Sequence, residues 1–454
     1  ESMIPDLLQK LDPHSSYIPA REVAESTADL EGKFFGIGVM FNMLTDTIVI
    51  QNVVPGGPSS KVGIENGDRI MRIDGKNVAG QKIPSDEIIR RLRGGDGTPV
   101  VLGIARSGLD SLIDITVTRG EVAVNSVDAA FMISPGIGYI KLLRFSRTSH
   151  QEVVEAIDRL RKEGMQELIL DLKSNGGGYL DQAILIANEF LPEGAMIVYT
   201  KGRKGITAVQ KADGKGHFIG DNLIILINEG TASSSEIVSG ALQDNDLGIL
   251  IGRRTFGKGL VQQQIPLQDG SLLNLSIAHY HTPTGRNIQR SYRNGSEEYY
   301  KDFIDRIMRG EMVNKDSIKM IDSLKFTTPK GKVVYGGGGI MPDIFVPADT
   351  TPYNKFETAA LTSLYMVRYT NSYIDKHRKE LNAIKNFPEL DDYLNRHSEA
   401  IFDGYMRHIE SAAKIKPTPQ EIAASRSEIM ALLKAYIGQA SQIDNEAFYR
   451  YILP

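Results

Sequence analysis

The sequence predicts an α/β fold that carries an inserted β-rich domain and ends in a helical extension. Strand patterns and amphipathic helix patterns alternate over residues 121–349, which is typical of a largely parallel sheet covered by helices. Residues 29–120 are rich in glycine and in short strand patterns. From residue 350 to residue 454 glycine thins out and helix-forming residues dominate. Residues 1–28 predict two short helices around a proline-bearing turn, so we expect four segments in all.

Hydrophobic periodicity predicts the individual strands and helices of the core and of the inserted segment. In the core, strands are predicted at 136–142, 167–172, 222–228 and 247–252, helices at 150–164, 180–190 and 234–245, and an antiparallel pair at 260–267 and 271–281. In the inserted segment, strands at 100–105 and 113–119 flank a polar turn and predict a hairpin, and 85–94 predicts a helix.

Composition excludes several classes of function. The chain has 454 residues, with 52 basic against 56 acidic side chains, so charge gives no reason to expect nucleic acid or an anionic membrane as a partner. It contains no cysteine, which excludes disulfides, thiol catalysis and cysteine-bound metals and fits an oxidising compartment. No stretch approaches the roughly 18 apolar residues of a membrane span. We expect that any export signal has been removed.

A cluster of serines lies where an apolar strand pattern turns into an amphipathic helix pattern, in ILINEGTASSSEIVSGALQD (225–244). A serine hydroxyl at such a turn is lifted out of the sheet, near the positive end of the helix dipole, and suits acyl transfer. Helix capping by Thr231 or by the serines, with Glu236 nearby, explains the same pattern. Taken alone, this motif favours capping.

A lysine between two glycines forms a second motif, in RRTFGKGLVQQQ (253–264). Lys258 could act as a general base if burial lowered its pKa, although a solvated loop lysine is the commoner case. Residues 252–259 nearly match a phosphate-binding loop. The match lacks the Ser or Thr that holds Mg²⁺, and a strand rather than a helix is expected next, so nucleotide binding is disfavoured.

The third motif is the glycine-rich turn in LDLKSNGGGYLDQA (170–183), whose backbone N–H groups could face a ligand. An ordinary strand-to-helix loop or a phosphate cradle is the alternative.

Histidine is the commoner partner of a catalytic serine, and the chain contains eight histidines. His279 and His281 alternate on an expected strand and could share a metal, but no third ligand is near in sequence. Ordinary strand residues are favoured, and we expect neither a metal nor a cofactor.

Together these motifs resemble the carboxyl-terminal processing peptidases, also called tail-specific proteases. The resemblance extends over about residues 5–349. It is carried by LDPHSSYI (11–18), DLKSNGGGYLDQA (171–183), GTASSSEIVSGALQD (230–244), GRRTFGKGLVQ (252–262), AHYHTPTGRNIQ (278–289) and YGGGGIMPDIFVP (335–347). The family implies a serine endopeptidase with a core of the Clp-protease and crotonase ββα type. It also implies substrates bound through their C-termini.

The resemblance also assigns roles to residues. Ser233 is implied as the nucleophile and Lys258 as its general base, at the family's separation of twenty-five positions. Gln262 matches the residue that orients the lysine. The oxyanion hole would use backbone N–H groups of Gly177 or Gly178 and of Ser234. Asp244 matches an acidic position that supports the structure. Two positions depart from the family pattern: Gly176 replaces a proline, and Ser234 replaces an alanine.

The inserted segment 29–120 resembles the PDZ domain that this family carries. In FFGIGVMF (34–41) the backbone of Phe35, Gly36, Ile37, Gly38 and Val39 is expected to hold a terminal carboxylate, beside a strand edge that can accept an extended peptide. A purely structural β-module is the alternative.

Two classes of function fit these features: an active endoprotease that senses C-terminal tails, and a peptide-binding scaffold on an inactive peptidase fold. The chain retains both Ser233 and Lys258, which favours the enzyme. The expected partners are protein or peptide substrates and no nucleic acid, and the expected location is the bacterial periplasm or cell envelope. Dimerisation, covering of the active site and adaptor binding are all left open for residues 350–454, with a homodimer as one option.

Overall fold

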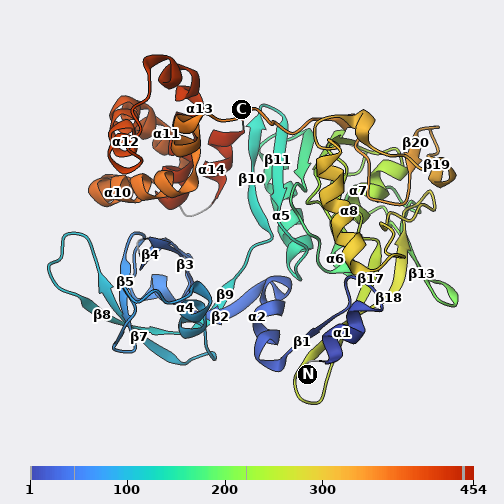
Figure 1. Cartoon of the computed structure of the whole chain (residues 1–454), viewed down its shortest axis with the longest axis horizontal. Helices are drawn as coiled ribbons and strands as arrows, with labels where there is room; N and C mark the ends of the chain where they lie inside the picture. The colour runs from blue at the N-terminus through green and yellow to red at the C-terminus, as the bar shows by residue number, and fades with distance from the viewer. Residues whose placement is uncertain (1–2, 45, 221, 442–444, 454) are drawn as a thin grey trace. The chain divides into compact units, whose positions relative to one another are not determined.

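The structure is a computed structural model that describes residues 3–44, 46–220, 222–441 and 445–453. It contains two compact units (Figure 1). One joins residues up to Gly32 with Val124–Thr350, and the other joins Lys33–Ala123 with residues from Thr351 onward. The inserted β-rich segment and the helical extension therefore associate with each other, although they are far apart in the sequence.

The first unit is built on a six-stranded sheet in the order β10-β11-β12-β15-β16-β21. Only β10 and β11 pair antiparallel, and the other neighbours are parallel. The strands are β10 Val127–Ser134, β11 Ile137–Leu142, β12 Glu167–Asp171, β15 Asn222–Ile227, β16 Ile249–Gly252 and β21 Ile344–Phe345. The helices α5 Ser149–Lys162, α6 Leu180–Asn188 and α7 Ser234–Asp244 connect them. One apolar core of Leu, Ile, Val and Phe side chains unites these strands and helices.

A second, five-stranded sheet completes this unit. Its order is β1-β18-β13-β14, with β17 also paired to β18. The strands are β1 Ser16–Ile18, β13 Met196–Gly202, β14 Gly205–Lys211, β17 Leu260–Pro266 and β18 Leu272–His281. The short β1, which the sequence did not indicate, pairs antiparallel with β18 and fixes the N-terminal segment to the sheet. This unit also contains the helices α1 Met3–Gln9, α2 Ala20–Glu31 and α8 Ser296–Met308 and an antiparallel hairpin of β19 Lys325–Thr327 and β20 Val333–Tyr335.

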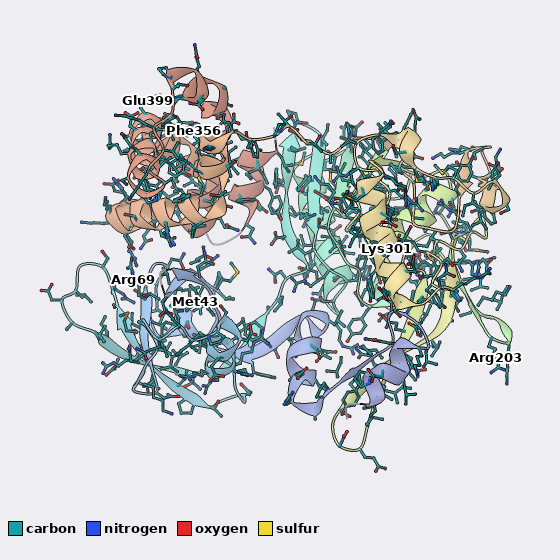
Figure 2. The ribbon with its side chains drawn as sticks, viewed as in Figure 1. Met43, Arg69, Arg203, Lys301, Phe356 and Glu399 are labelled. Carbon is teal, nitrogen blue, oxygen red and sulfur yellow. The ribbon has the colours of Figure 1, made fainter. Side chains whose placement is uncertain are left out.

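The inserted segment forms a small sheet in the order β3-β4-β5-β7-β8, with β6 beside β5. Its elements are β3 Val39–Leu44, β4 Thr47–Val53, α3 Pro58–Lys61, β5 Arg69–Ile73, β6 Lys76–Asn77, α4 Ser85–Leu92, β7 Pro99–Ala105 and β8 Ile113–Thr118. Side chains such as Ile48, Ile88 and Leu102 are fully buried in its own core. A two-stranded ribbon of β2 Lys33–Gly36 and β9 Gly120–Ala123 leads into and out of it. Met43 lies on the edge strand β3 (Figure 2).

The extension after Thr350 is helical, as the sequence predicted. Its helices are α9 Lys355–Leu361, α10 Ser363–Leu381, α11 Phe387–Arg396, α12 Ser398–Ala412, α13 Pro419–Ser441 and α14 Glu446–Ile452. They enclose an apolar core that includes Phe356, labelled in Figure 2. Arg69 of β5 forms an ion pair of 2.5 Å with Asp375 of α10. None of the helices in the described ranges combines the length and the apolar character that a bilayer crossing requires.

Candidate active site

Ser233 lies on the sharp turn between β15 and α7. Its backbone has φ 55° and ψ −116°, in a region that residues other than glycine rarely adopt. Such a conformation costs on the order of 1–3 kcal/mol and is found where a side chain must be presented for function. Ser233 is half-buried, whereas the next residue, Ser234, is 1% exposed. The turn therefore singles out the first serine of the run and leaves it accessible.

One buried carboxylate holds the backbone of both Ser233 and Lys258. The Oε2 atom of Glu236 accepts a hydrogen bond of 2.9 Å from the N–H of each of these two residues. Its Oε1 atom accepts bonds from Gly257 N, at 2.8 Å, and from the Thr255 hydroxyl. Glu236 is 0% exposed, so burial raises its pKa, and the four donated hydrogen bonds act against that rise. This carboxylate was missed as a site residue because its sequence position indicates only helix capping.

Lys258 is held by Gln262 and Tyr280. Its Nζ atom donates to Gln262 Oε1 at 2.7 Å. The buried Tyr280 hydroxyl donates to the carbonyl oxygens of Lys258 and Ser233, at 2.6 and 3.1 Å. Burial lowers the pKa of the Lys258 ammonium, while Asp12 and Glu236 act in the opposite direction. Within the described residues no hydrogen bond joins Lys258 Nζ to Ser233 Oγ.

The glycine-rich turn packs directly against the serine turn. Gly177 has φ +95°, and a Cβ atom there would lie 2.8 Å from the Cβ of Ser233, so this position requires glycine. Its N–H donates to Asn175 Oδ1 at 2.9 Å. Of the two glycines predicted to contribute a donor, Gly177 is therefore already engaged, whereas Gly178 N has no acceptor among the described residues. The Ser234 hydroxyl donates to the Gly178 carbonyl at 2.8 Å and ties the two turns together.

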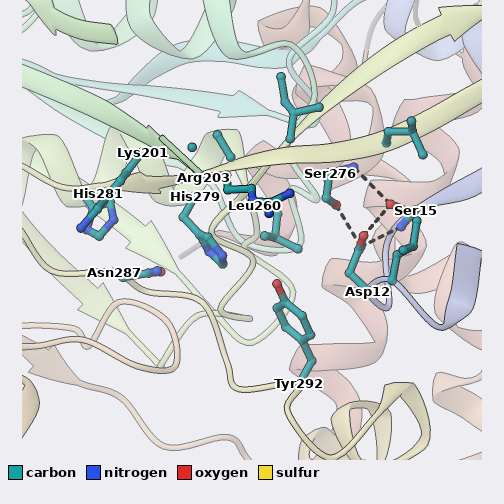
Figure 3. Close-up of a pocket in the computed structure, with 15 residues that line it drawn as sticks. Asp12, Ser15, Lys201, Arg203, Leu260, Ser276, His279, His281, Asn287 and Tyr292 are labelled. Carbon is teal, nitrogen blue, oxygen red and sulfur yellow. Dashed lines mark hydrogen bonds between the residues drawn. The ribbon is translucent and has the colours of Figure 1, made fainter. Parts of the chain in front are cut away.

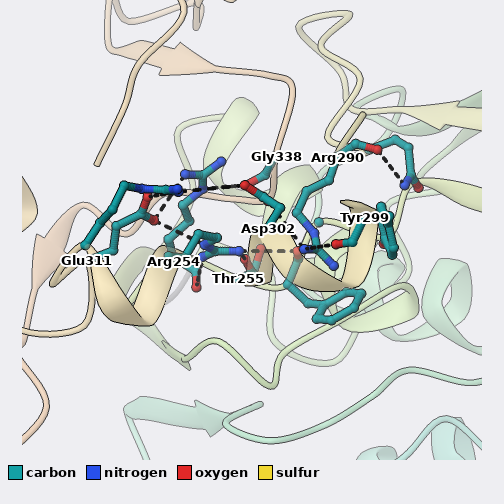
Figure 4. A network of polar contacts seen from close by, with 12 residues as sticks. Arg254, Thr255, Arg290, Tyr299, Asp302, Glu311 and Gly338 are labelled. Carbon is teal, nitrogen blue, oxygen red and sulfur yellow. Dashed lines mark hydrogen bonds and ion pairs between the residues drawn. The ribbon is translucent and has the colours of Figure 1, made fainter. Parts of the chain in front are cut away.

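The loop that carries Lys258 is anchored by a cluster of buried charges (Figure 4). Arg306 donates to Glu311 at 3.1 Å and to the carbonyl oxygen of Thr255 at 3.1 Å, and both charged side chains are only 1% exposed. Arg254 from the same loop also contacts Glu311. Arg290 stacks on the ring of Phe256, 4.3 Å from its centroid. These contacts hold the loop and keep the backbone of Lys258 in place.

Asp244, predicted as a supporting residue, closes the far end of α7. It forms an ion pair of 2.6 Å with Arg286, and neither side chain is exposed. Its Oδ2 atom also accepts the Thr284 hydroxyl at 2.7 Å. The contacts of Asp244 thus fix the 282–289 loop rather than reach the serine turn.

A hollow of about 640 Å³ is lined by β17, β18 and the end of β13 (Figure 3). His279 and His281 both face it, and Asp12, Ser15 and Ser276 form its opposite end. His279 Nδ1 is buried and has no hydrogen-bond partner among the described residues, and His281 Nδ1 contacts the Gly285 carbonyl at 3.0 Å. No third metal ligand joins the two histidines, since the described ranges contain no group of three or more His, Cys, Asp or Glu residues suited to a metal ion.

A second hollow, of about 380 Å³, lies between β3 and α4. Of the five residues expected to hold a terminal carboxylate, Ile37, Gly38 and Val39 line this hollow, whereas Phe35 and Gly36 lie outside its lining. The N–H groups of Ile37 and Gly38 have no acceptor within the described ranges. Arg93, which the sequence did not indicate, lies at this hollow with its guanidinium 4.5 Å from the ring of Phe34.

Models of three sequence families match parts of this chain. The sequence model of peptidase family S41 matches residues 136–296, and that of the PDZ domain matches residues 36–126. A family of unknown function, DUF8443, matches residues 358–441.

A carboxy-terminal-processing protease of Bartonella bacilliformis is 38% identical over 295 residues, which are 64% of this chain and 67% of that protein. A carboxyl-terminal-processing protease of Synechocystis sp. is 36% identical over 293 residues, 63% of this chain and 68% of that protein. Among solved structures, a photosystem II D1 C-terminal processing protease covers 77% of this chain and 82% of its own, with 26% identity and a TM-score of 0.41.

The class defined by the fold and these matches is a serine peptidase with an α/β core and an inserted PDZ domain. Since relatives above 30% identity are matched over two thirds of their length, the chain belongs to the carboxyl-terminal processing proteases of peptidase family S41. The predictions of family, fold class and enzyme class are thereby confirmed.

Proposed function

We propose that this chain cleaves proteins after binding their C-terminal tails, with Ser233 as the nucleophile and Lys258 as the general base. The observation that carries the proposal is the Glu236 carboxylate, which accepts the N–H groups of both residues at 2.9 Å. A nucleophile and a base that share one buried anchor keep a fixed separation, as acyl transfer requires. The strained backbone of Ser233 supports the same assignment.

The reaction would proceed through an acyl-enzyme. Neutral Lys258 takes the proton from Ser233 Oγ as that oxygen attacks the substrate carbonyl carbon, and the same proton then passes to the leaving amine. In the second half, Lys258 takes a proton from a water molecule as its oxygen attacks the ester carbonyl carbon. Lys258 then returns that proton to Ser233 Oγ as the carboxylic acid product leaves. In this structure Nζ is held by Gln262, and we expect its bond to Ser233 to form when substrate is bound.

The oxyanion of each tetrahedral intermediate needs two N–H donors, and we propose Gly178 and Ser234. Gly178 N has no acceptor among the described residues, and Ser234 N is the first donor of α7, where the helix dipole also favours a negative charge. Gly177, the alternative predicted from the sequence, already donates to Asn175.

We propose that the PDZ domain recognises a free, apolar C-terminus. The N–H groups of Ile37 and Gly38 suit the terminal carboxylate, and Arg93 adds a positive charge at the same hollow. The edge of β3 pairs only with β4 in the described sheet, so its other side can accept an extended peptide. Apolar side chains of β3 and α4 line the place of the last residue.

The test uses the purified chain and one unstructured polypeptide in three forms, with a free apolar C-terminus, an amidated C-terminus and a charged last residue. The free apolar form should be cleaved fastest. Ser233→Ala and Lys258→Ala should each remove essentially all turnover, because residues that act as a unit are not additive. Ser239→Ala is the matched control, since its hydroxyl only donates to the carbonyl of Ser235 within α7. Cleavage by Ser233→Ala at the normal rate would refute the dyad.

We further propose that the enzyme works in the bacterial periplasm or cell envelope. A chain without cysteine is suited to an oxidising compartment. Fractionation of the source cells, followed by immunoblotting, tests this location. A homodimer, one of the options left open for the helical extension, is tested by sedimentation of the full chain and of a chain that ends at Thr350.

A further inference from the structure

The turn that precedes β1 is folded by one buried carboxylate (Figure 3). Asp12 is 6% exposed, and its Oδ1 atom accepts the N–H groups of His14 and Ser15, both at 2.8 Å, and the Ser276 hydroxyl at 2.9 Å. Its Oδ2 atom accepts the Ser15 hydroxyl. A turn with four such bonds has little freedom, because breaking any of them would leave a buried polar group without a partner.

This turn reaches the base through the side-chain amide of Gln262. Gln262 Nε2 donates to the carbonyl oxygen of His14 at 2.7 Å, and Gln262 Oε1 accepts from Lys258 Nζ at 2.7 Å. A backbone carbonyl can only accept, so it selects the nitrogen end of the amide. The oxygen end must then face Lys258. A flipped amide would place oxygen against oxygen and NH₂ against the amine of the lysine.

Other contacts keep the turn in place from two sides. Ser276 N of β18 donates to the Ser15 hydroxyl at 3.1 Å, and β1 continues directly into the sheet beside it. On the other side, His14 Nε2 lies 2.9 Å from the hydroxyl of Tyr299 in α8. The position of the His14 carbonyl is therefore set by the tertiary structure on both sides of the turn.

We propose that Asp12 is a positioning residue for catalysis, which folds the 12–15 turn so that the His14 carbonyl orients Gln262 and Gln262 in turn orients Lys258. The proposal rests on the function of Lys258 proposed above. It gives the LDPHSSYI segment, which lies more than two hundred residues before Ser233, a direct part in arranging the base. Asp12 would not touch the substrate or the reacting atoms.

The charge of Asp12 has a second, separable effect on the base. The ionisable groups whose charges bear on Lys258 are Asp12, Glu236 and His14. Burial lowers the pKa of His14 to about 4, so its imidazole is neutral at neutral pH and adds no charge there. The two carboxylates favour the ammonium form of Lys258 and oppose the effect of its burial. Removing the charge of Asp12 should therefore make Lys258 easier to deprotonate.

Two substitutions at Asp12 separate these effects. Asp12→Asn keeps an oxygen at Oδ1 for three of the four hydrogen bonds, and its NH₂ group can donate to a rotated Ser15 hydroxyl. We expect kcat near that of the wild type and an acid limb of the kcat/KM profile displaced to lower pH. Asp12→Ala abolishes the turn, and kcat should fall about 10- to 100-fold with little change in KM.

A double-mutant cycle with Gln262 tests whether Asp12 acts through that residue. If it does, Asp12→Ala combined with Gln262→Ala should be no slower than Gln262→Ala alone. The matched control is Asp269→Ala, because this exposed aspartate accepts the same kind of turn bonds from Ser271 N, at 3.0 Å, and the Ser271 hydroxyl. Its rate and pH profile should not change.

If the rate losses of the two single variants multiply in the double variant, Asp12 does not act through Gln262 and the proposal is overturned. An acid limb that does not move in Asp12→Asn would refute the separate effect of the Asp12 charge. If Asp12→Ala fails to fold, the kcat of Asp12→Asn still decides, because this variant keeps an oxygen for three of the four turn bonds, and a kcat lowered 10-fold or more would show that these bonds do not position the base. Cleavage that survives in Ser233→Ala would instead contradict the proposed function, so the two failures can be told apart.

Discussion

Replacing Glu236 by glutamine tests whether one buried carboxylate fixes the backbone of both Ser233 and Lys258. The carboxylate accepts four hydrogen bonds and donates none, and glutamine offers only one oxygen in the same space. With that oxygen turned toward Ser233 N and Lys258 N, the NH₂ group faces Gly257 N and Thr255. The Thr255 hydroxyl oxygen already accepts the N–H of Ile340 at 2.6 Å.

The cost of this substitution follows from the bonds that are lost. Gly257 N is left buried without an acceptor, which costs about 1–3 kcal/mol. The two bonds that remain become neutral instead of charge-assisted, a further loss of about 1 kcal/mol each. Removing a buried negative charge offsets part of this, so we expect the free energy of unfolding to fall by about 2–4 kcal/mol. A shift of the serine turn by a fraction of an ångström should also lower kcat by about 100-fold.

Urea denaturation followed by fluorescence measures the stability, and cleavage of an unstructured polypeptide under saturating conditions measures kcat. Glu229→Gln is the matched control, because Glu229 only pairs with Arg253 in a partly exposed position and should lose less than about 1 kcal/mol. The reasoning is wrong if Glu236→Gln matches the wild type in both stability and kcat.

Three further predictions concern separate parts of the molecule. Activity should rise with pH through one ionisation whose pKa lies below the free lysine pKa of about 10.4, because burial lowers the pKa of Lys258 and only its neutral form accepts a proton. A flat pH–rate profile would contradict this. Asp244→Ala leaves the fully buried Arg286 without its ion-pair partner, so calorimetry should show that the free energy of unfolding falls by about 3–5 kcal/mol. An unchanged melting temperature would contradict a structural role for this ion pair. Ile89→Glu places a charge in the groove beside α4 and should abolish the preference for a free apolar C-terminus. The control Val101→Glu, at an exposed position of β7, should preserve that preference. A preference retained in Ile89→Glu would exclude this groove as the tail-binding site.

Local patterns were sufficient for the elements next to Ser233 and for the resemblance to the family, whereas β10, β13, β14 and α8 were not predicted. The strand and helix expected on either side of Ser233 are found as β15 and α7, and the hairpin expected at 100–105 and 113–119 is found as β7 and β8. Each of these elements buries one face, so its apolar residues recur along the sequence at the period of a helix or a strand. The three-residue strand β1 was not predicted, because its pairing with β18 depends on residues more than two hundred and fifty positions away.

The candidate site divides in the same way. The resemblance to the family implied Ser233, Lys258 and Gln262 as site residues, but nothing near Glu236 in the sequence shows that its carboxylate also accepts the N–H groups of the 257–258 loop. The sequence offered Gly177 and Gly178 as equal donors, and the bond from Gly177 N to Asn175 separates them. In the PDZ domain, Ile37, Gly38 and Val39 line the groove, whereas the neighbouring Phe35 and Gly36 do not.

The sequence by itself determined the alternation of strands and helices in the core, the resemblance to the peptidase family and the chemical types available for catalysis. It could do so because period, turn residues and motif spacing are local properties of the chain. Only the tertiary structure decided which polar groups are already paired, which N–H groups remain without an acceptor, and how Asp12 reaches Lys258 through His14 and Gln262. Hydrogen bonding and burial depend on atoms brought together from distant segments, and the path of the chain in space sets those distances.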